Sequence, residues 1–109
     1  MGETLQYFRV EKRGDIHFVT IDHPPYNSVF AEMLEPATQF LAALGRDPDT
    51  SAIVLTGAGD DFTRGMDVKV AAAFTDESRE RTRIAINEFC AELHRLPCAF
   101  VCAVNGHTI

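Results

Sequence analysis

Two uninterrupted apolar runs, at residues 52–56 and 98–104, most constrain what this chain can fold into. An apolar run without polar alternation is typical of a strand that is buried on both faces. The segment between these runs, residues 75–96, places Ile86, Phe89 and Leu93 three or four positions apart, which is the spacing of one helix face. A buried strand, a helix and a second buried strand predict a crossover unit of a parallel sheet.

The amino-terminal third adds two strands and a helix. Residues 7–12 and 16–21 have strand composition, and the turn residues between them, with Gly14 at the centre, predict a hairpin. Apolar residues then recur at helical spacing from Phe30 to Leu44. Pro36 interrupts this stripe, so either the helix kinks there or its regular part starts at Pro36, where proline is tolerated in a first turn.

Helix start signals follow the run at 52–56. Asp67 precedes residues 68–74 as a candidate cap of a short helix, and Thr75 precedes two acids at the start of a longer one. Pro97 ends that helix, and Asn105 and Gly106 are typical turn residues. The order is strand, strand, helix, strand, helix, helix, strand, which predicts an α/β fold of crossover units.

Composition limits the classes of function. The 109 residues suffice for one domain, or for part of a larger one, and the net charge of −6 disfavours binding to nucleic acid or to an anionic membrane. The amino terminus lacks the apolar core of a signal peptide, and no apolar run has membrane-spanning length, so we expect no membrane partner. Three cysteines without a secretion signal indicate reduced thiols and a cytoplasmic location.

The loop TGAGDDFTRGMD at residues 56–67 raises the question of a nucleotide site. A dinucleotide fingerprint requires a third glycine where this chain has Phe62, and Gly65 comes three positions too late. No Gly-Lys pair of the phosphate-loop type follows. A plain loop with turn glycines remains an alternative interpretation.

Cysteine and histidine spacing raises a second question, that of a zinc site. Cys90, His94, Cys98 and Cys102 are four positions apart, and His107 follows. Structural zinc sites favour close Cys-x-x-Cys pairs, which are missing here, and Pro97 interrupts the helix. We therefore expect the thiols to lie in the core, with no metal bound, and His23, beside two prolines, to be structural or solvated.

Three segments together resemble the enoyl-CoA hydratase/isomerase (crotonase) family. They are VEKRGDIHFVTIDHPPYNS, AIVLTGAGDDFTRGMDV and the terminal AFVCAVNGHTI, in the family's order and at its spacing. The resemblance implies crotonase-like ββα crossover units with a mixed or parallel sheet core that is incomplete at its carboxyl-terminal end. Residues 1–109 would then be the amino-terminal portion of a single crotonase-like domain.

The resemblance also implies a site. The backbone N–H of Met66 would be one of two donors to the carbonyl oxygen of an acyl-CoA thioester, in an oxyanion hole. Gly65 would let the backbone approach the thioester, and Asp67 would cap the following helix. Arg64, for which we favour a solvent-exposed position, and Lys69 would either reach a CoA phosphate or point into water. His107 could touch substrate, although no acidic partner is visible for it in the sequence.

The family's second donor and its acid/base carboxylates match no residue of this sequence. Glu88 and Glu92 lie one turn apart on the polar side of an ordinary helix, so they do not read as a catalytic pair. We expect an enzyme of enoyl-CoA hydration or isomerisation by resemblance, with coenzyme A entering only as part of the substrate and with trimers or hexamers as the assembly. The alternative is a truncated, non-catalytic module for acyl-CoA binding or oligomerisation.

Overall fold

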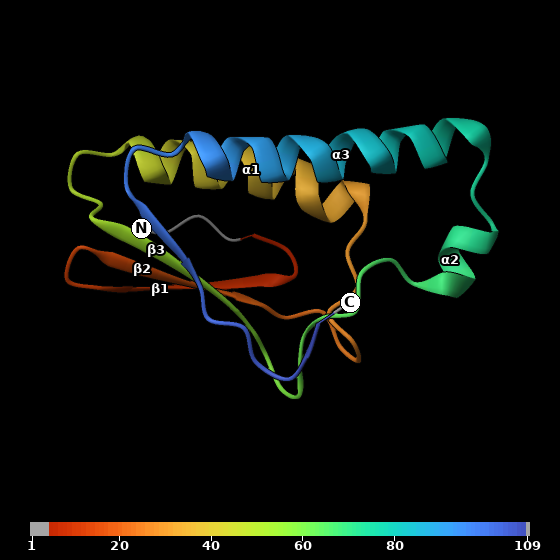
Figure 1. The fold of residues 1–109 in the computed structure, drawn as a ribbon, viewed down its shortest axis with the longest axis horizontal. Helices are drawn as coiled ribbons and strands as arrows, with labels where there is room; N and C mark the ends of the chain where they lie inside the picture. Colours follow the sequence, from red (N-terminus) through yellow and green to blue (C-terminus); the bar gives the residue numbers. More distant parts are fainter. Residues whose placement is uncertain (1–4, 109) are drawn as a thin grey trace.

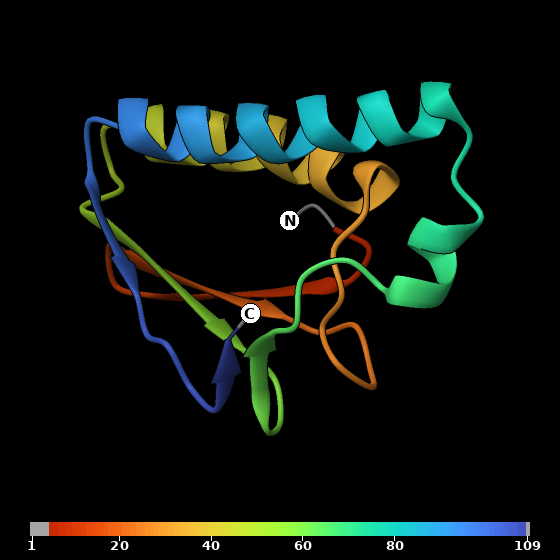
Figure 2. The same cartoon turned by 45° about the vertical axis from the view of Figure 1, so that its right-hand side comes forward.

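The structure, a computed structural model, describes residues 5–108, so both ends of the expected domain at 1–109 lie outside the described residues. Two long helices lie side by side over one face of a four-stranded sheet (Figures 1 and 2). The strands are β1 (Phe8–Arg13), β2 (Ile16–Ile21), β3 (Ala52–Gly57), β4 (Asp61–Thr63), β5 (Ala99–Cys102) and β6 (His107–Thr108). The helices are α1 (Ala31–Arg46), α2 (Val68–Ala72) and α3 (Asp76–Arg95).

The main sheet has the strand order β1-β2-β3-β5. β1 and β2 form the predicted antiparallel hairpin, in which Gly14 adopts φ +63°. β2 pairs with β3, and β3 with β5, in parallel, and α1 and α3 are the crossover connections. The predicted α/β layout with a mixed sheet is therefore confirmed.

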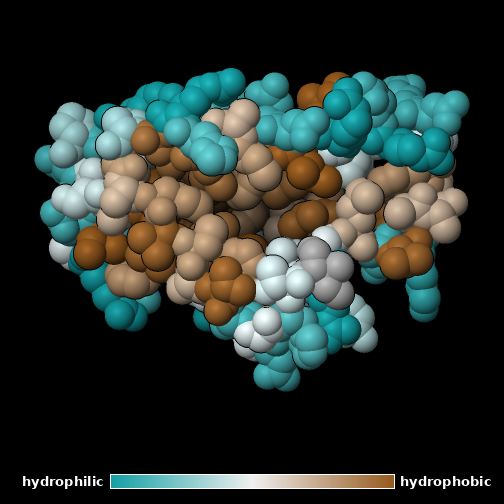
Figure 3. Space-filling view, viewed as in Figure 1, coloured by the Kyte–Doolittle hydropathy of each residue, from teal (hydrophilic) through white to brown (hydrophobic). Residues whose placement is uncertain are grey.

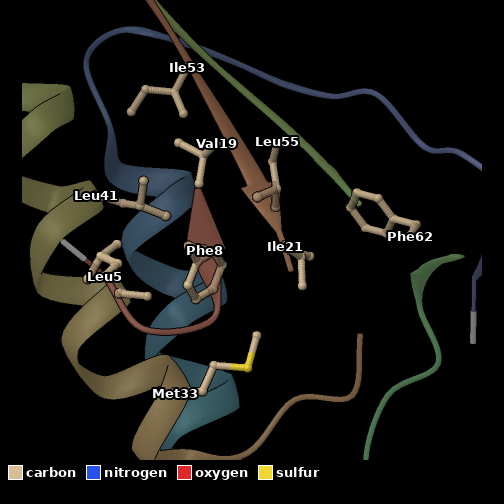
Figure 4. Packing of buried hydrophobic residues seen from close by; sticks show 10 residues of the cluster. Leu5, Phe8, Val19, Ile21, Met33, Leu41, Ile53, Leu55 and Phe62 are labelled. Carbon is tan, nitrogen blue, oxygen red and sulfur yellow. The ribbon is translucent and has the colours of Figure 1, made fainter. Parts of the chain in front are cut away.

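The core lies between this sheet and α1. Val19 of β2 and Ile53 of β3 are fully buried, and Met33 and Leu41 of α1 are 1% exposed. These side chains converge in Figure 4, where the helix contributes one apolar stripe and the strands their inner face. This packing anchors the carboxyl ends of β2 and β3, from which the loops of the candidate site depart.

Helix α1 begins before Pro36, which was one of the two starting points considered from the sequence. It starts at Ala31, so a start at Pro36 is wrong, and Pro36 lies inside the helix. The first turn is secured because the N–H of Leu34 donates to the Phe30 carbonyl at 3.1 Å. Ala31 and Leu34 are also buried against Ala85 of α3. Tertiary packing thus outweighs the hydrogen bond that proline cannot make.

The two edges of the main sheet differ in polarity. β1 has the sequence FRVEKR, with four charged residues, whereas β5 has AFVC and none. Val101 of β5 is 51% exposed, and apolar residues gather in Figure 3 over the area where Figure 1 draws β5. The expectation of core thiols is wrong for Cys90 and Cys102, which are exposed, because no described strand lies beyond β5 and Cys90 lies on an uncovered side of α3.

A second, two-stranded sheet was not predicted. β4 pairs in parallel with β6, and the remaining part of the apolar run after Cys102 is irregular rather than strand. Strands of two or three residues are too short to show a periodic pattern. A strand, and not a helix, therefore follows the glycine loop, which agrees with the rejection of a dinucleotide fingerprint.

The long helices carry their charges on their outer faces. Arg83 pairs with Glu80, and Arg81 pairs with Glu35, each at 2.6 Å. Exposed pairs of this kind contribute little to stability. Across residues 5–108, no helix combines the length and the apolar character needed to cross a bilayer.

Candidate functional site

The loop after β4 includes a backbone N–H, that of Met66, which has no partner within residues 5–108. The N–H of Arg64 donates to the Tyr26 carbonyl at 3.1 Å, and the Gly65 carbonyl accepts from the Val29 N–H at 2.9 Å. Two loops from distant parts of the sequence are thereby joined. The N–H of Met66, the next residue, forms no hydrogen bond with any atom in the described part of the chain.

Local backbone geometry explains how Met66 is presented. Gly65 adopts φ +77°, in the left-handed region that favours glycine. Asp67 then caps α2, since its Oδ1 accepts from the N–H groups of Lys69 at 2.8 Å and Val70 at 3.3 Å. The predicted capping role of Asp67 is confirmed. Met66 is thus held between a glycine turn and a capped helix.

Met66 lines a cavity of about 390 Å³. The cavity lies among the start of α1, the loop after β4, α2 and the start of α3. Most of its wall is apolar, which suits an acyl chain. Its lining residues include His23, Val29, Phe30, Met66, Val70 and Phe74.

His23 is the lining residue whose role the sequence did not reveal. Its Nδ1 lies 2.6 Å from the carbonyl oxygen of Ser28, and its ring centroid lies 4.6 Å from that of Tyr7 and 5.4 Å from that of Phe30. Through Nδ1, His23 has the structural role that was expected, because it bonds to the backbone of the following loop. His23 also lines the cavity, and a lone histidine beside prolines gives no sequence signal for that position.

The carboxylates near this cavity are engaged elsewhere. Asp67 caps α2, and Glu32, at the exposed start of α1, accepts a hydrogen bond from Arg81 at 3.2 Å. Arg81 in turn is also held by Glu35, whose pKa lies below its ordinary value chiefly because of the hydrogen bond from Arg81. Among the described residues of the cavity wall, both carboxylates, Glu32 and Asp67, are therefore already engaged and are not placed as a free acid or base.

Arg64 and His107 meet at a different carboxylate. The Nε of Arg64 lies 2.9 Å, and the Nδ1 of His107 lies 3.0 Å, from Oδ1 of Asp61, whose side chain is 6% exposed. The Arg64 guanidinium also lies 4.3 Å from the centre of the Tyr26 ring. The Arg64 side chain is 36% exposed, but it is held by Asp61 and Tyr26 and does not simply point into water. The acidic partner of His107 that was not visible in the sequence is Asp61.

This cluster lowers the pKa of Asp61. The hydrogen bond from Arg64 holds the pKa of Asp61 below its ordinary value; burial acts in the opposite direction, and the charges of Arg64 and His107 reinforce the lowering. A carboxylate that is ionised and bonded in this way ties β4 to β6. Sequence spacing missed the contact because 43 positions separate Arg64 from His107.

The structure thus separates the expected site residues into two groups. Met66 and Asp67 line the 390 Å³ cavity, whereas Arg64 and His107 line a neighbouring hollow of about 470 Å³. Lys69 is exposed and lines neither.

Comparison with known proteins gives a consistent result. The sequence model of the enoyl-CoA hydratase/isomerase family matches residues 11–109. The enoyl-CoA hydratase EchA19 of Mycobacterium tuberculosis is 34% identical over 107 residues, which cover 92% of this chain and 39% of that protein.

Solved structures share the fold. DspI of Pseudomonas aeruginosa is 28% identical, with a TM-score of 0.88 over 98% of this chain and 41% of that one. An enoyl-CoA hydratase of Bacillus anthracis, 24% identical, has a TM-score of 0.85 over 93% of this chain and 40% of that one, a likeness of fold alone. The chain spans about two fifths of the length of these relatives.

Proposed function

The chain belongs to the enoyl-CoA hydratase/isomerase family, and we propose that its cavity binds an acyl-CoA thioester whose carbonyl oxygen accepts a hydrogen bond from the Met66 N–H. One observation carries this proposal. The Met66 amide is unpaired in the described part of the chain, and Met66 lies in the wall of an apolar cavity, whereas the amides of Arg64 and Gly65 are already bonded.

The chemistry follows from where charge develops. When a thioester becomes enolate-like, negative charge gathers on its carbonyl oxygen, and a preorganised N–H stabilises that charge more than the neutral carbonyl. Removing one such donor typically costs about 3–4 kcal/mol of barrier. The donor belongs to the backbone, so the Met66 side chain is not required for it. By family resemblance the second donor comes from a glycine triplet that this sequence does not contain.

The other expected residues have distinct parts in the proposal. Gly65 provides the turn that presents the amide, and Asp67 holds α2 in place. Lys69 is exposed and supplies a cation for the phosphates of coenzyme A. Arg64 and His107 line the neighbouring hollow, and we assign to them the part of coenzyme A that extends beyond the acyl cavity.

We further propose that the 109-residue chain binds the thioester without hydrating it. Hydration requires an acid/base group, and the carboxylates at this cavity are engaged as a helix cap and in an ion pair. A continuous assay with crotonyl-CoA tests this point. Turnover clearly above the buffer blank contradicts the proposal.

The donor role of Met66 is tested with two variants at the same position. Met66→Ala keeps the N–H and should bind butyryl-CoA like the unmodified chain, while Met66→Pro lacks the N–H and should bind about tenfold more weakly. Calorimetry measures both affinities, and circular dichroism with thermal melting establishes that both variants fold. Equal affinities of the two folded variants rule out the amide as a donor.

A second candidate is a non-catalytic module that associates through its sheet. The uncharged edge strand β5, with Val101 half exposed, favours this candidate, since unprotected edges pair with other chains. It predicts oligomers in sedimentation velocity whether or not a thioester is bound. The trimers or hexamers expected from the family would also be seen in that experiment.

A further inference from the structure

His23 has a fixed ring with one nitrogen engaged and one free. A carbonyl oxygen can only accept a hydrogen bond, so the Nδ1 of His23, 2.6 Å from the Ser28 carbonyl, carries a proton. In the neutral ring Nε2 then has a lone pair. Nε2 forms no hydrogen bond with any atom of residues 5–108.

The surroundings hold this ring in one orientation. Oδ1 of Asn27 accepts from the His23 N–H at 2.9 Å, and the Asn27 N–H donates back to the His23 carbonyl at 2.8 Å. The rings of Tyr7 and Phe30 both contact the imidazole, and they also contact each other. A side chain restrained by its backbone, one hydrogen bond and two aromatic rings is preorganised for a second partner.

The cavity supplies the place for that partner. His23 and Met66 line the same 390 Å³ space, and the Gly65–Val29 hydrogen bond joins their two loops. The wall between them is largely apolar, with Val29, Phe30 and Val70. Several other polar residues of the wall are bonded elsewhere: Arg81 to Glu32, Thr82 to the Ser78 carbonyl, and Asp67 as the cap of α2. The Met66 N–H can donate and the His23 Nε2 can accept, and neither has a partner within residues 5–108.

A ligand that matches both groups has an acceptor and a donor on a short apolar body. We propose that His23 Nε2 accepts a hydrogen bond from a hydroxyl on the acyl chain, and that it thereby selects hydroxyacyl thioesters over thioesters of the same length without a hydroxyl. This inference rests on the proposed thioester function of the same cavity. It makes His23 a specificity-determining residue. The physical source of the selectivity is a partly buried acceptor that the hydroxyl-free ligand covers and leaves unpaired.

The test compares 3-hydroxybutyryl-CoA with butyryl-CoA by calorimetry on the 109-residue chain. One neutral hydrogen bond predicts that the hydroxyl ligand binds about three- to tenfold more tightly. His23→Asn places an amide N–H where Nδ1 donates to Ser28 but has no atom at the position of Nε2. This variant should lose the preference and bind the two ligands with equal affinity. His23→Gln, whose amide reaches the Nε2 position, should recover part of the preference, and His107→Asn, in the other hollow, should preserve all of it.

A second readout needs no variant. Diethyl pyrocarbonate acylates an unprotonated imidazole nitrogen, and peptide mapping by mass spectrometry distinguishes His23 from the other histidines. The hydroxyl ligand should protect His23 more strongly than butyryl-CoA at equal occupancy. If both ligands bind without a difference in affinity or protection, or if His23→Asn weakens both equally, the selectivity is refuted while thioester binding stands. If neither ligand binds, the proposed function and this inference fail together.

Discussion

The side-chain amide of Asn105 pairs with both backbone groups of Gly57. Its Oδ1 accepts from the Gly57 N–H at 2.9 Å, and its Nδ2 donates to the Gly57 carbonyl at 2.9 Å. The same Oδ1 accepts from the Thr56 hydroxyl at 2.9 Å, and Nδ2 also contacts the Gly59 carbonyl at 3.2 Å. One side chain therefore closes the end of β3 as a neighbouring strand would.

Asn105→Ala should destabilise the chain by about 1–3 kcal/mol, because it leaves part-buried groups of Gly57 unpaired. Urea unfolding monitored by circular dichroism measures the change. Asn105→Asp keeps the acceptor but loses the donor, so we expect an intermediate loss. If Asn105→Ala is as stable as the unmodified chain, water replaces the hydrogen bonds of the amide without loss of stability, which contradicts the prediction.

Two glycines with the same backbone angle form a matched pair. Gly14 and Gly106 both adopt φ +63°, but a Cβ at Gly14 would meet nothing within 4 Å, whereas one at Gly106 would overlap the Asp60 carbonyl oxygen. Gly14→Ala should cost about 1–2 kcal/mol from the left-handed conformation alone. Gly106→Ala should cost about 3 kcal/mol or more, since the backbone must also move. Thermal melting of the two variants side by side measures the difference; equal losses contradict the predicted overlap.

The Asp61 cluster predicts a loss of stability in acid. The pKa of Asp61 is lowered in the folded chain, first by the Arg64 hydrogen bond, so its stabilising effect is present above the unfolded value of about 3.9 and disappears as the pH falls through the folded value. Asp61→Asn should lower the melting temperature at neutral pH and flatten its decline in acid. Asp60→Asn removes the same charge from the adjacent exposed residue and should retain the decline. If the melting temperature of Asp61→Asn declines in acid as steeply as that of the unmodified chain, the Asp61 cluster is not the cause of the decline.

Lys69 provides a test of coenzyme A recognition. Lys69→Gln should weaken butyryl-CoA binding about two- to fivefold, and it should make the affinity less sensitive to salt, because an exposed cation attracts the phosphates through screened charge. Lys12→Gln on the hairpin makes the same change of net charge far along the sheet from the cavity loops. Calorimetry at low and high salt measures the affinity of both variants for butyryl-CoA. If the two variants weaken binding equally, Lys69 acts only through the net charge of the chain and not by contact with the phosphates.

Local patterns were sufficient for the main elements of the fold. The apolar runs predicted β3 and β5, the turn around Gly14 predicted the hairpin, and Asp67 and Thr75 were correctly identified as caps of α2 and α3. Each of these features depends on residues close together in sequence, for which spacing and composition are reliable physical signals.

The features that escaped prediction depend on contacts between distant residues. Asp61, Arg64 and His107 meet only because β4 pairs with β6, and neither strand is long enough to show a pattern. The start of α1 before Pro36 depends on packing against α3. The cavity position of His23 depends on the hydrogen bond between Val29 and Gly65, which spacing cannot reveal.

The unequal margins of the main sheet give it a direction of growth. A strand that paired with β1 would lie against its charged side chains, which oppose such pairing. Residues 96–106, which include β5, contain no Asp, Glu, Lys or Arg. We therefore expect a further strand, whatever its source, to pair beside β5 and not beside the hairpin. The sheet would then be enlarged in one direction only.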